Sequence, residues 1–251
     1  MLTVKGLSCS YGDLKVLYDV NFAAELQSKL LIVGPNGCGK TTLLKAIAGL
    51  IPYEGVVEIE GENIAHFSKK ARAKKVGLLS QISTIYFSYT VYETVMQGRY
   101  VHMADGIFKS VRKVDEEVVL KYLEMTGLLE FADKSIQNLS GGQLQRVFLA
   151  RVFAQEPDVI MLDEPTNHLD LKYQLELMAY LDEWVKEERR LVVGVVHDMN
   201  LALSFADEIL MLKDGRVLAQ EKSESLDLRL MNQTFDVDVM GYMQGSLKRW
   251  E

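Results

Sequence analysis

A glycine-rich segment, Gly34-Pro35-Asn36-Gly37-Cys38-Gly39-Lys40-Thr41, constrains this chain more than any other feature. It fits the pattern G-x-x-x-x-G-K-[ST], follows an apolar run at residues 29–33 and precedes apolar residues at helical spacing in residues 42–50. Glycines let main-chain N–H groups approach phosphate oxygens, and a helix start adds a positive dipole end. The segment therefore predicts a strand, a phosphate-binding loop and a helix.

Within this loop, Lys40 is predicted to reach the β- and γ-phosphates, and the Thr41 hydroxyl to bind Mg²⁺. Cys38 is interpreted as a small filler. A plain glycine-rich turn without a ligand is the alternative. The candidate nucleotide-binding residues of the segment are Gly34, Pro35, Asn36, Gly37, Cys38, Gly39, Lys40, Thr41 and Thr42.

Two acids, Asp163 and Glu164, end another apolar run at residues 159–162. Ligands collect at strand ends in α/β sheets, and Mg²⁺ prefers oxygen ligands. Asp163 is thus a candidate Mg²⁺ ligand, and Glu164 is a candidate base for the water that attacks the γ-phosphate. By itself such a pair is more typical of a solvated strand end, but after a phosphate-binding loop it indicates hydrolysis.

A third motif, Leu139-Ser140-Gly141-Gly142-Gln143, stands at the head of a helix predicted for residues 143–155, where an anion is favoured. With this motif the sequence resembles the ATP-binding cassette (ABC) ATPases along nearly the whole chain. The resemblance implies a head-to-tail dimer that holds two ATP molecules between subunits. In it, Ser140, Gly141, Gly142 and Gln143 contact the ATP bound by the other subunit's Lys40.

The resemblance assigns roles to four further residues. Tyr11 is similar to the aromatic residue that stacks on adenine, with a turn tyrosine as the alternative. Gln81 is similar to the glutamine that senses Mg²⁺ and the attacking water, and His197 to the histidine that contacts the γ-phosphate. Asp170 is similar to the aspartate that contacts the partner subunit. His66, His102 and His168 are given no catalytic role.

The implied fold is α/β: the P-loop ATPase fold of the ABC family, as a single domain over residues 1–251. It has a mainly parallel core sheet, an antiparallel N-terminal β subdomain and an inserted helical subdomain at about residues 86–156. The residue patterns agree with these parts. Strands are expected within residues 2–26 and at 56–60, 76–80, 159–162 and 191–196, a hairpin at 209–213 and 216–220, and helices at 91–97, 111–125 and 143–155.

Composition limits the partners. The net charge of −7 disfavours nucleic acid as a direct partner, and no apolar run of 18 residues is present to span a bilayer. The N-terminal residues lack an export signal, and two cysteines are too few for a disulfide framework. Together with these limits, the ABC resemblance implies a peripheral protein at the cytoplasmic face of the inner membrane. The partners that the resemblance implies are a second copy, a permease and, indirectly, a substrate-binding protein.

Residues 90–102, 197–202 and 213–217 resemble the ATPase subunits of iron-siderophore, haem and cobalamin importers, although Val101 stands where a proline is usual. An ATPase subunit of such an importer is the leading hypothesis. The alternatives are a metal-ion importer, an exporter, a motor on nucleic acid or ribosomes, and a regulatory nucleotide-binding module. An aromatic cluster is predicted either to line the permease contact or to pack in the core: Tyr86, Phe87, Tyr89 and Tyr92.

Overall fold

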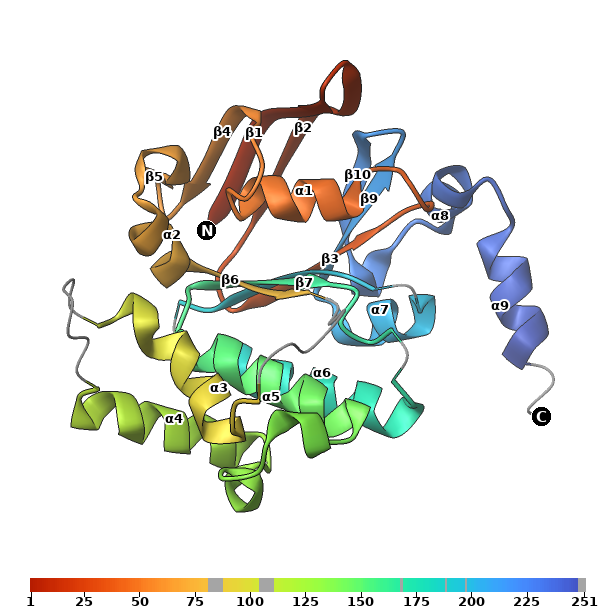
Figure 1. Cartoon of the computed structure of the whole chain (residues 1–251). Coiled ribbons are helices and arrows are strands. Elements are labelled where there is room, and N and C mark those ends of the chain that lie inside the picture. The colour runs from red at the N-terminus through yellow and green to blue at the C-terminus, as the bar shows by residue number, and fades with distance from the viewer. Residues whose placement is uncertain (81–87, 104–110, 168, 188, 197, 248–251) are drawn as a thin grey trace. The chain divides into compact units, whose positions relative to one another are not determined.

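The structure is a computed structural model of the whole chain and describes residues 1–80, 88–103, 111–167, 169–187, 189–196 and 198–247 (Figure 1). Its internal contacts divide the chain into two compact units. Unit 1 contains Met1–Ala65 and Val193–Glu251, and unit 2 contains His66–Val192. Within the described ranges, no helix combines the length and apolar character that crossing a membrane requires.

Unit 1 begins with an antiparallel sheet in the order β2-β1-β4-β5. Its strands are β1 (Leu2–Tyr11), β2 (Leu14–Ala24), β4 (Glu54–Ile59) and β5 (Glu62–Asn63). Alternate residues such as Leu2 and Val4 are buried, and their neighbours are more exposed, as expected of a strand with one covered face. The antiparallel N-terminal sheet predicted from the sequence is confirmed.

The strand before the glycine-rich loop is β3 (Ser28–Val33), which pairs in parallel with β9 (Glu208–Lys213). Residues 30–33 are at most 2% exposed, which explains their continuous apolar run. β10 (Arg216–Lys222) pairs antiparallel with β9 through a turn in which Asp214 and Gly215 both have positive φ, 48° and 71°. This confirms the predicted hairpin.

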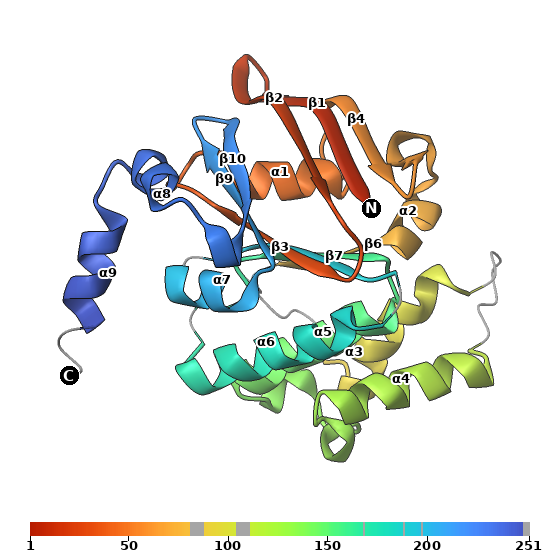
Figure 2. The same ribbon diagram turned by 180° about the vertical axis from the view of Figure 1, so that it is seen from behind.

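Helices complete unit 1: α1 (Lys40–Ile47), α7 (Met199–Phe205), α8 (Leu228–Phe235) and α9 (Val239–Leu247), with short 3₁₀ turns at η1 (Ile64–His66) and η5 (Ser223–Ser225). Seen from behind, α8 lies beside the β9–β10 hairpin, and α9 follows it (Figure 2). β8 (Leu191–Val195) is fully buried and crosses the division between the units.

Unit 2 contains the parallel strands β6 (Val76–Ser80) and β7 (Val159–Asp163). Its helices are α2 (Lys69–Lys75), α3 (Val91–Met96), α4 (Lys113–Met125), α5 (Gly141–Ala154) and α6 (Leu171–Val185), with 3₁₀ turns η2 (Gln97–Val101), η3 (Leu129–Phe131) and η4 (Ile136–Asn138). α5 contacts α3, α4 and β6, and the buried rings of Tyr122, Phe153 and Trp184 pack in sequence between α4, α5 and α6. With both parallel and antiparallel strand pairs among helices, the predicted α/β class is confirmed.

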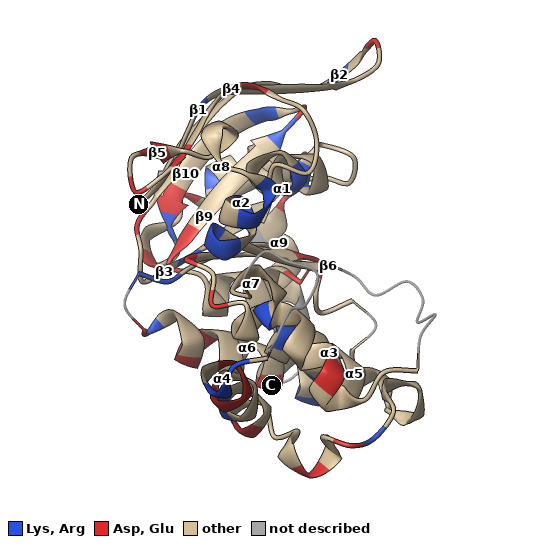
Figure 3. Cartoon of the chain, turned by 60° about the vertical axis from the view of Figure 1, so that its left-hand side comes forward, with Lys and Arg blue, Asp and Glu red and all other residues tan. Residues whose placement is uncertain are grey.

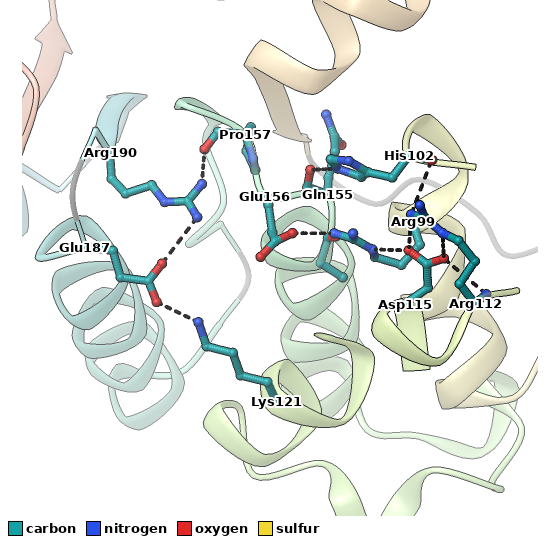
Figure 4. Close-up of polar contacts among 11 residues, drawn as sticks. Arg99, His102, Arg112, Asp115, Lys121, Gln155, Glu156, Pro157, Glu187 and Arg190 are labelled. Carbon is teal, nitrogen blue, oxygen red and sulfur yellow. Dashed lines mark hydrogen bonds and ion pairs between the residues drawn. The ribbon is translucent and has the colours of Figure 1, made fainter. Parts of the chain in front are cut away.

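A buried ion network ties η2 to α4 and to the end of α5 (Figure 4). The Arg99 guanidinium donates to Asp115 Oδ1 at 3.1 Å, to Glu156 Oε2 at 2.7 Å and to the Ala154 carbonyl oxygen at 2.7 Å. Arg112 Nε donates to the other Asp115 oxygen at 3.0 Å. Because the Asp115 side chain is fully buried, these donors supply the partners that its charge needs.

Helix α2 is basic along most of its length (Figure 3), with the sequence KKARAKK. Ser68 caps its start by accepting from the Ala71 N–H, and the cationic residues of its last turn lie at the negative end of the helix dipole. Lys75 pairs with Asp158 at 2.6 Å. These local contacts explain how a helix without a buried residue is held on unit 2.

Two helices start two residues away from their predicted starts. The helix predicted to start at residue 111 starts at Lys113, because Arg112 is extended and its N–H donates to the Asp115 carboxylate. The helix predicted to start at residue 143 starts at Gly141, because Ser140 is its cap. In both cases a side-chain cap, rather than apolar spacing, sets the first turn.

Candidate nucleotide site and its catalytic acids

The glycine-rich loop connects β3 to α1 through close main-chain contacts. A methyl carbon added at Gly34 would lie 2.0 Å from the Leu212 carbonyl oxygen, so only glycine fits beside β9. Gly39 is the N-cap of α1 with φ 107°, a conformation that side chains rarely adopt. Because Gly39 has no side chain that could accept a hydrogen bond, the first N–H groups of α1 are left for an anion.

Lys40 is bent back over this loop. Its ammonium donates to the carbonyl oxygens of Gly34 at 2.7 Å and Pro35 at 2.9 Å, and the residue is only 7% exposed. Among the described residues, no carboxylate pairs with it. A buried cation held only by neutral carbonyls is a favourable site for phosphate oxygens, so the loop fits a nucleotide.

Cys38 is anchored by residues that lie far away in the sequence. Its carbonyl oxygen accepts from the Gly215 N–H at 3.1 Å, and the Gly215 carbonyl oxygen accepts from the Tyr18 N–H at 2.8 Å. Burial raises the pKa of the Cys38 thiol despite the opposing effect of nearby Lys40, so the thiol stays neutral at pH 7. The filler interpretation of Cys38 agrees with this geometry.

Tyr11 ends β1 at the hairpin turn and is 50% exposed. Beside the loop, unit 1 has a pocket of about 370 Å³ whose lining includes Lys15, Tyr18, Asn36 and Asp214. Our sequence analysis did not identify Lys15, Tyr18 or Asp214, because these residues reach the loop only through the folded β2 strand and the β9–β10 turn.

The two acids lie at the end of β7 in unit 2, as their apolar run indicated. Glu164 has φ 54°, a strained backbone for a residue with a side chain. Its Oε2 accepts from Asn167 Nδ2 at 2.7 Å, and its carbonyl oxygen accepts from the Asn167 N–H at 3.3 Å. Asn167, which sequence analysis did not single out, thereby fixes the direction of the Glu164 carboxylate.

Ser140 caps α5, and Gly141, Gly142 and Gln143 form its first turn. Ser140 Oγ accepts from the Gln143 N–H at 3.3 Å, and Gln143 Oε1 accepts from the Ser140 N–H at 3.0 Å. In this capping box, both side chains are occupied by hydrogen bonds from main-chain N–H groups. The glycine N–H groups at the helix start are therefore the donors that can meet an anion.

Gln145 and Asp170 connect this helix start to the acids. Gln145, which is buried, donates from Nε2 to the carbonyl oxygen of Pro165, the residue after Glu164, at 3.0 Å. Asp170 caps α6 by accepting from the Tyr173 N–H at 3.1 Å. Gln145 is another residue that sequence analysis missed, since its role depends on a contact between separate segments.

The structure therefore describes two sets of predicted residues, each within its own unit. Tyr11 and residues 34–42 are in unit 1, whereas Asp163, Glu164, Asp170 and residues 140–143 are in unit 2. Gln81 and His197 lie outside the described residues. The first set offers N–H groups and a cation, which suit phosphates. The second offers carboxylates, which suit a divalent cation and a proton.

Comparison with known proteins agrees with this chemistry. The ABC transporter family profile matches residues 17–167. The ferric enterobactin transport ATP-binding protein of Escherichia coli is 40% identical over 85% of this chain and 79% of its own. The iron(3+)-hydroxamate import ATP-binding protein of Bacillus subtilis is 35% identical over 94% of this chain and 88% of its own.

Among solved structures, the chain is similar to a dimeric ATP-binding cassette in a post-hydrolysis state with ADP and Pi. The two are 31% identical, with a TM-score of 0.76, and the match covers 90% of this chain and the full length of the cassette. This similarity confirms the ABC ATPase fold predicted from the sequence. The profile match covers more than half of the chain, and the relatives are similar along most of their length. The chain therefore belongs to the ABC transporter family, as one of its ATP-binding and ATP-hydrolysing proteins.

Proposed function

We propose that this chain is the ATPase subunit of an importer that carries a metal chelate, such as an iron-siderophore complex, haem or cobalamin, through a separate membrane permease. The observation that supports this substrate class is the similarity, along most of both chains, to subunits that transport ferric enterobactin and iron(3+)-hydroxamate. The chain would be peripheral at the cytoplasmic face of the inner membrane. A permease would be its direct partner and a substrate-binding protein an indirect one.

In this proposal, the N–H groups of residues 37–42 and the Lys40 ammonium bind the phosphates, and Tyr11 stacks on adenine. The Thr41 hydroxyl and the Asp163 carboxylate would hold Mg²⁺, because both are hard oxygen donors of the kind this cation prefers. With this ion bound, the site would gain positive charge that offsets the charge developing on the γ-phosphate.

Glu164 takes a proton from the water that attacks the γ-phosphorus, and the bond from that phosphorus to the β–γ bridging oxygen breaks. The hydrogen bond from Asn167 supports this role, because it fixes one carboxylate oxygen and thus the direction of the other. Gln81 and His197 orient the same water and contact the γ-phosphate in the proposed site.

A second copy of the chain completes each site in the proposal. Its Ser140, Gly141, Gly142 and Gln143 meet the γ-phosphate across the interface, and its Asp170 contacts the partner loop. The dimeric assembly of a related cassette with ADP and Pi supports this arrangement. Loss of the γ-phosphate removes charge that links the two subunits, so hydrolysis would reopen the dimer.

We further propose that residues 86–156 act as a helical subdomain which, with the segment around Gln81, receives the permease. Tyr89 is 42% exposed in the segment before α3, and Tyr100 is 49% exposed in η2. Exposed aromatic side chains support a protein contact, because they bury a large area at low entropic cost. Tyr86 and Phe87 of the predicted cluster lie outside the described residues.

The testing experiment purifies the tagged chain from its native membranes in mild detergent and identifies what remains bound by mass spectrometry. A permease with several membrane spans, and MgATP turnover that Glu164→Gln abolishes while ATP still binds, are expected. Recovery of ribosomal proteins or nucleic acid in place of a permease would contradict the transport proposal. Undiminished turnover by Glu164→Gln would contradict the assignment of the base.

A further inference from the structure

Tyr173, in the first turn of α6, contacts two of the segments that the proposed function assigns to the dimer interface. Its N–H donates to Asp170 Oδ1 at 3.1 Å. Its ring lies flat against Gly142, since a methyl carbon added to the Gly142 α-carbon would be 2.7–2.8 Å from Cγ, Cδ1 and Cδ2 of the ring. One residue therefore links the start of α5 to the start of α6.

Other hydrogen bonds hold the segment between Glu164, the proposed catalytic base, and the start of α6. Gln145 Nε2 donates to the Pro165 carbonyl oxygen at 3.0 Å, and Gln174 Nε2 donates to the Leu169 carbonyl oxygen at 3.0 Å. These bonds hold Pro165 and Leu169, which lie between Glu164 and Asp170 in the chain. They do not involve the two glycines at the start of α5, of which only Gly142 is in contact with the Tyr173 ring.

Two consecutive glycines at a helix start are conformationally free and have no side chain by which their neighbours could hold them. Gly141 has open space where a side chain would be, so it gains no support from packing. Gly142, in contrast, is supported by the Tyr173 ring. A planar ring with few rotatable bonds is a suitable support for main-chain N–H groups that must point at an anion.

We infer that Tyr173 is a positioning residue for the reaction: its ring sets the Gly142 main chain relative to Asp170, so that Gly142 meets the partner subunit's nucleotide while Asp170 contacts the partner subunit's loop. This inference rests on the proposed function. The ring provides the contact, and no hydrogen bond of the Tyr173 hydroxyl is found among the described residues. A phenylalanine at position 173 is therefore expected to position Gly142 as well as tyrosine does.

The test uses the full chain carrying Glu164→Gln, which is expected to bind ATP without hydrolysing it. Dimer formation is followed by light scattering while the MgATP concentration is raised. Binding of a fluorescent ATP analogue is measured separately at a protein concentration too low for dimers. Tyr173→Phe and Tyr173→Ala are compared with Tyr180→Ala, which removes a half-buried tyrosine farther along the same helix.

Tyr173→Ala is expected to raise the MgATP concentration for half-maximal dimer formation at least tenfold, with analogue binding by the monomer unchanged. Tyr173→Phe and Tyr180→Ala should match the parent. If Tyr173→Ala does not fold, Tyr173→Leu replaces it, and the same shift is expected because leucine keeps apolar volume but is not planar.

The outcomes separate the inference from the function on which it rests. Failure of the Glu164→Gln parent to dimerise would count against the proposed function. A dimerising parent with an unshifted Tyr173→Ala would overturn only the role of Tyr173. Unfolding of both the alanine and leucine variants at 25 °C would make Tyr173 a folding residue and would also overturn the inference.

Discussion

The ammonium group of Lys40 donates to the carbonyl oxygen of Gly34 over 2.7 Å, so the cation is held by the loop in which it is proposed to bind phosphate. Lys40→Ala removes a charged donor for which a hydrogen bond contributes roughly 1.5–3 kcal/mol. We expect the Kd for MgATP to rise about 10- to 100-fold, as measured by isothermal titration calorimetry. Lys45→Ala, on the same helix but beyond the loop, should bind as the wild type does. Equal affinities for the two variants would contradict the assignment.

Gln145 provides a test of how the catalytic acid is positioned. Gln145→Leu keeps the approximate volume but leaves the buried Pro165 carbonyl oxygen without this donor, at a cost of about 1–3 kcal/mol in stability. Because Pro165 follows Glu164, we expect kcat for MgATP hydrolysis to fall and KM to change little. Steady-state kinetics and a urea titration check this. A higher KM with an unaltered kcat would be the contrary result.

Local sequence patterns were sufficient to predict the strands and the helix around the candidate site residues, because these elements depend on neighbours in the chain. Residues 29–33, the glycines and the helix beginning at Lys40 lie in one continuous segment, and the acids follow a buried strand directly. These relationships depend on spacing and polarity, which the sequence carries.

The remaining features depend on contacts between distant segments. Nothing near Gly215 indicates that its N–H reaches the Cys38 carbonyl oxygen, because this contact requires that β9 pair with β3. The support of Gly142 by Tyr173 likewise arises when α5 and α6 pack. Helix α8 was missed because it is short and mixed in polarity, although Asp227 caps its start and Asp236 ends it with φ 56°.

The buried ion network around Asp115 predicts that the folded state loses stability in acid. Hydrogen bonds from Arg112, followed by those from Arg99, lower the pKa of Asp115 below its ordinary 3.8, although burial opposes them. A carboxyl with a lowered folded-state pKa contributes stability that is present above 3.8 and is lost as the pH falls through the lower value. Asp115→Asn should therefore destabilise the chain by about 3–5 kcal/mol at neutral pH.

The measurement for Asp115 is the urea midpoint of wild type and Asp115→Asn from pH 7 down to pH 3. We expect the difference between them to begin to shrink as the pH falls below 3.8, because the Asp115 carboxyl of the unfolded chain then binds a proton while the folded carboxyl, with its lowered pKa, still resists protonation. Glu117→Gln removes an exposed acid of the same helix and should leave the wild-type profile unchanged. A constant difference across the whole pH range would show that charge is not the cause.

The burial of His102 predicts a second, milder dependence of stability on pH. Burial is the main reason that its pKa lies below 6.5, and its Nε2 is 2.8 Å from the Gln155 carbonyl oxygen. The folded state therefore resists protonation, so stability is lost as the pH falls below 6.5 towards the lowered value. His102→Gln should flatten the slope of unfolding free energy between pH 6.5 and 5. His66→Gln, at an exposed histidine, is the control, and equal slopes for the two variants would refute the prediction.

The packing of Tyr173 on Gly142 can be measured as a coupling free energy, independently of ATP. Gly142→Ala adds a methyl group 2.7 Å from ring carbons, so it should cost about 1–3 kcal/mol through overpacking. In the Tyr173→Ala background the space is open, and the same substitution should cost much less. Urea midpoints of the four proteins form a double-mutant cycle, with an expected interaction of about 0.5–3 kcal/mol. Gly141→Ala, which meets open space, should be nearly neutral in both backgrounds. If Gly142→Ala cost the same with and without the ring, the two residues would not be in contact in solution.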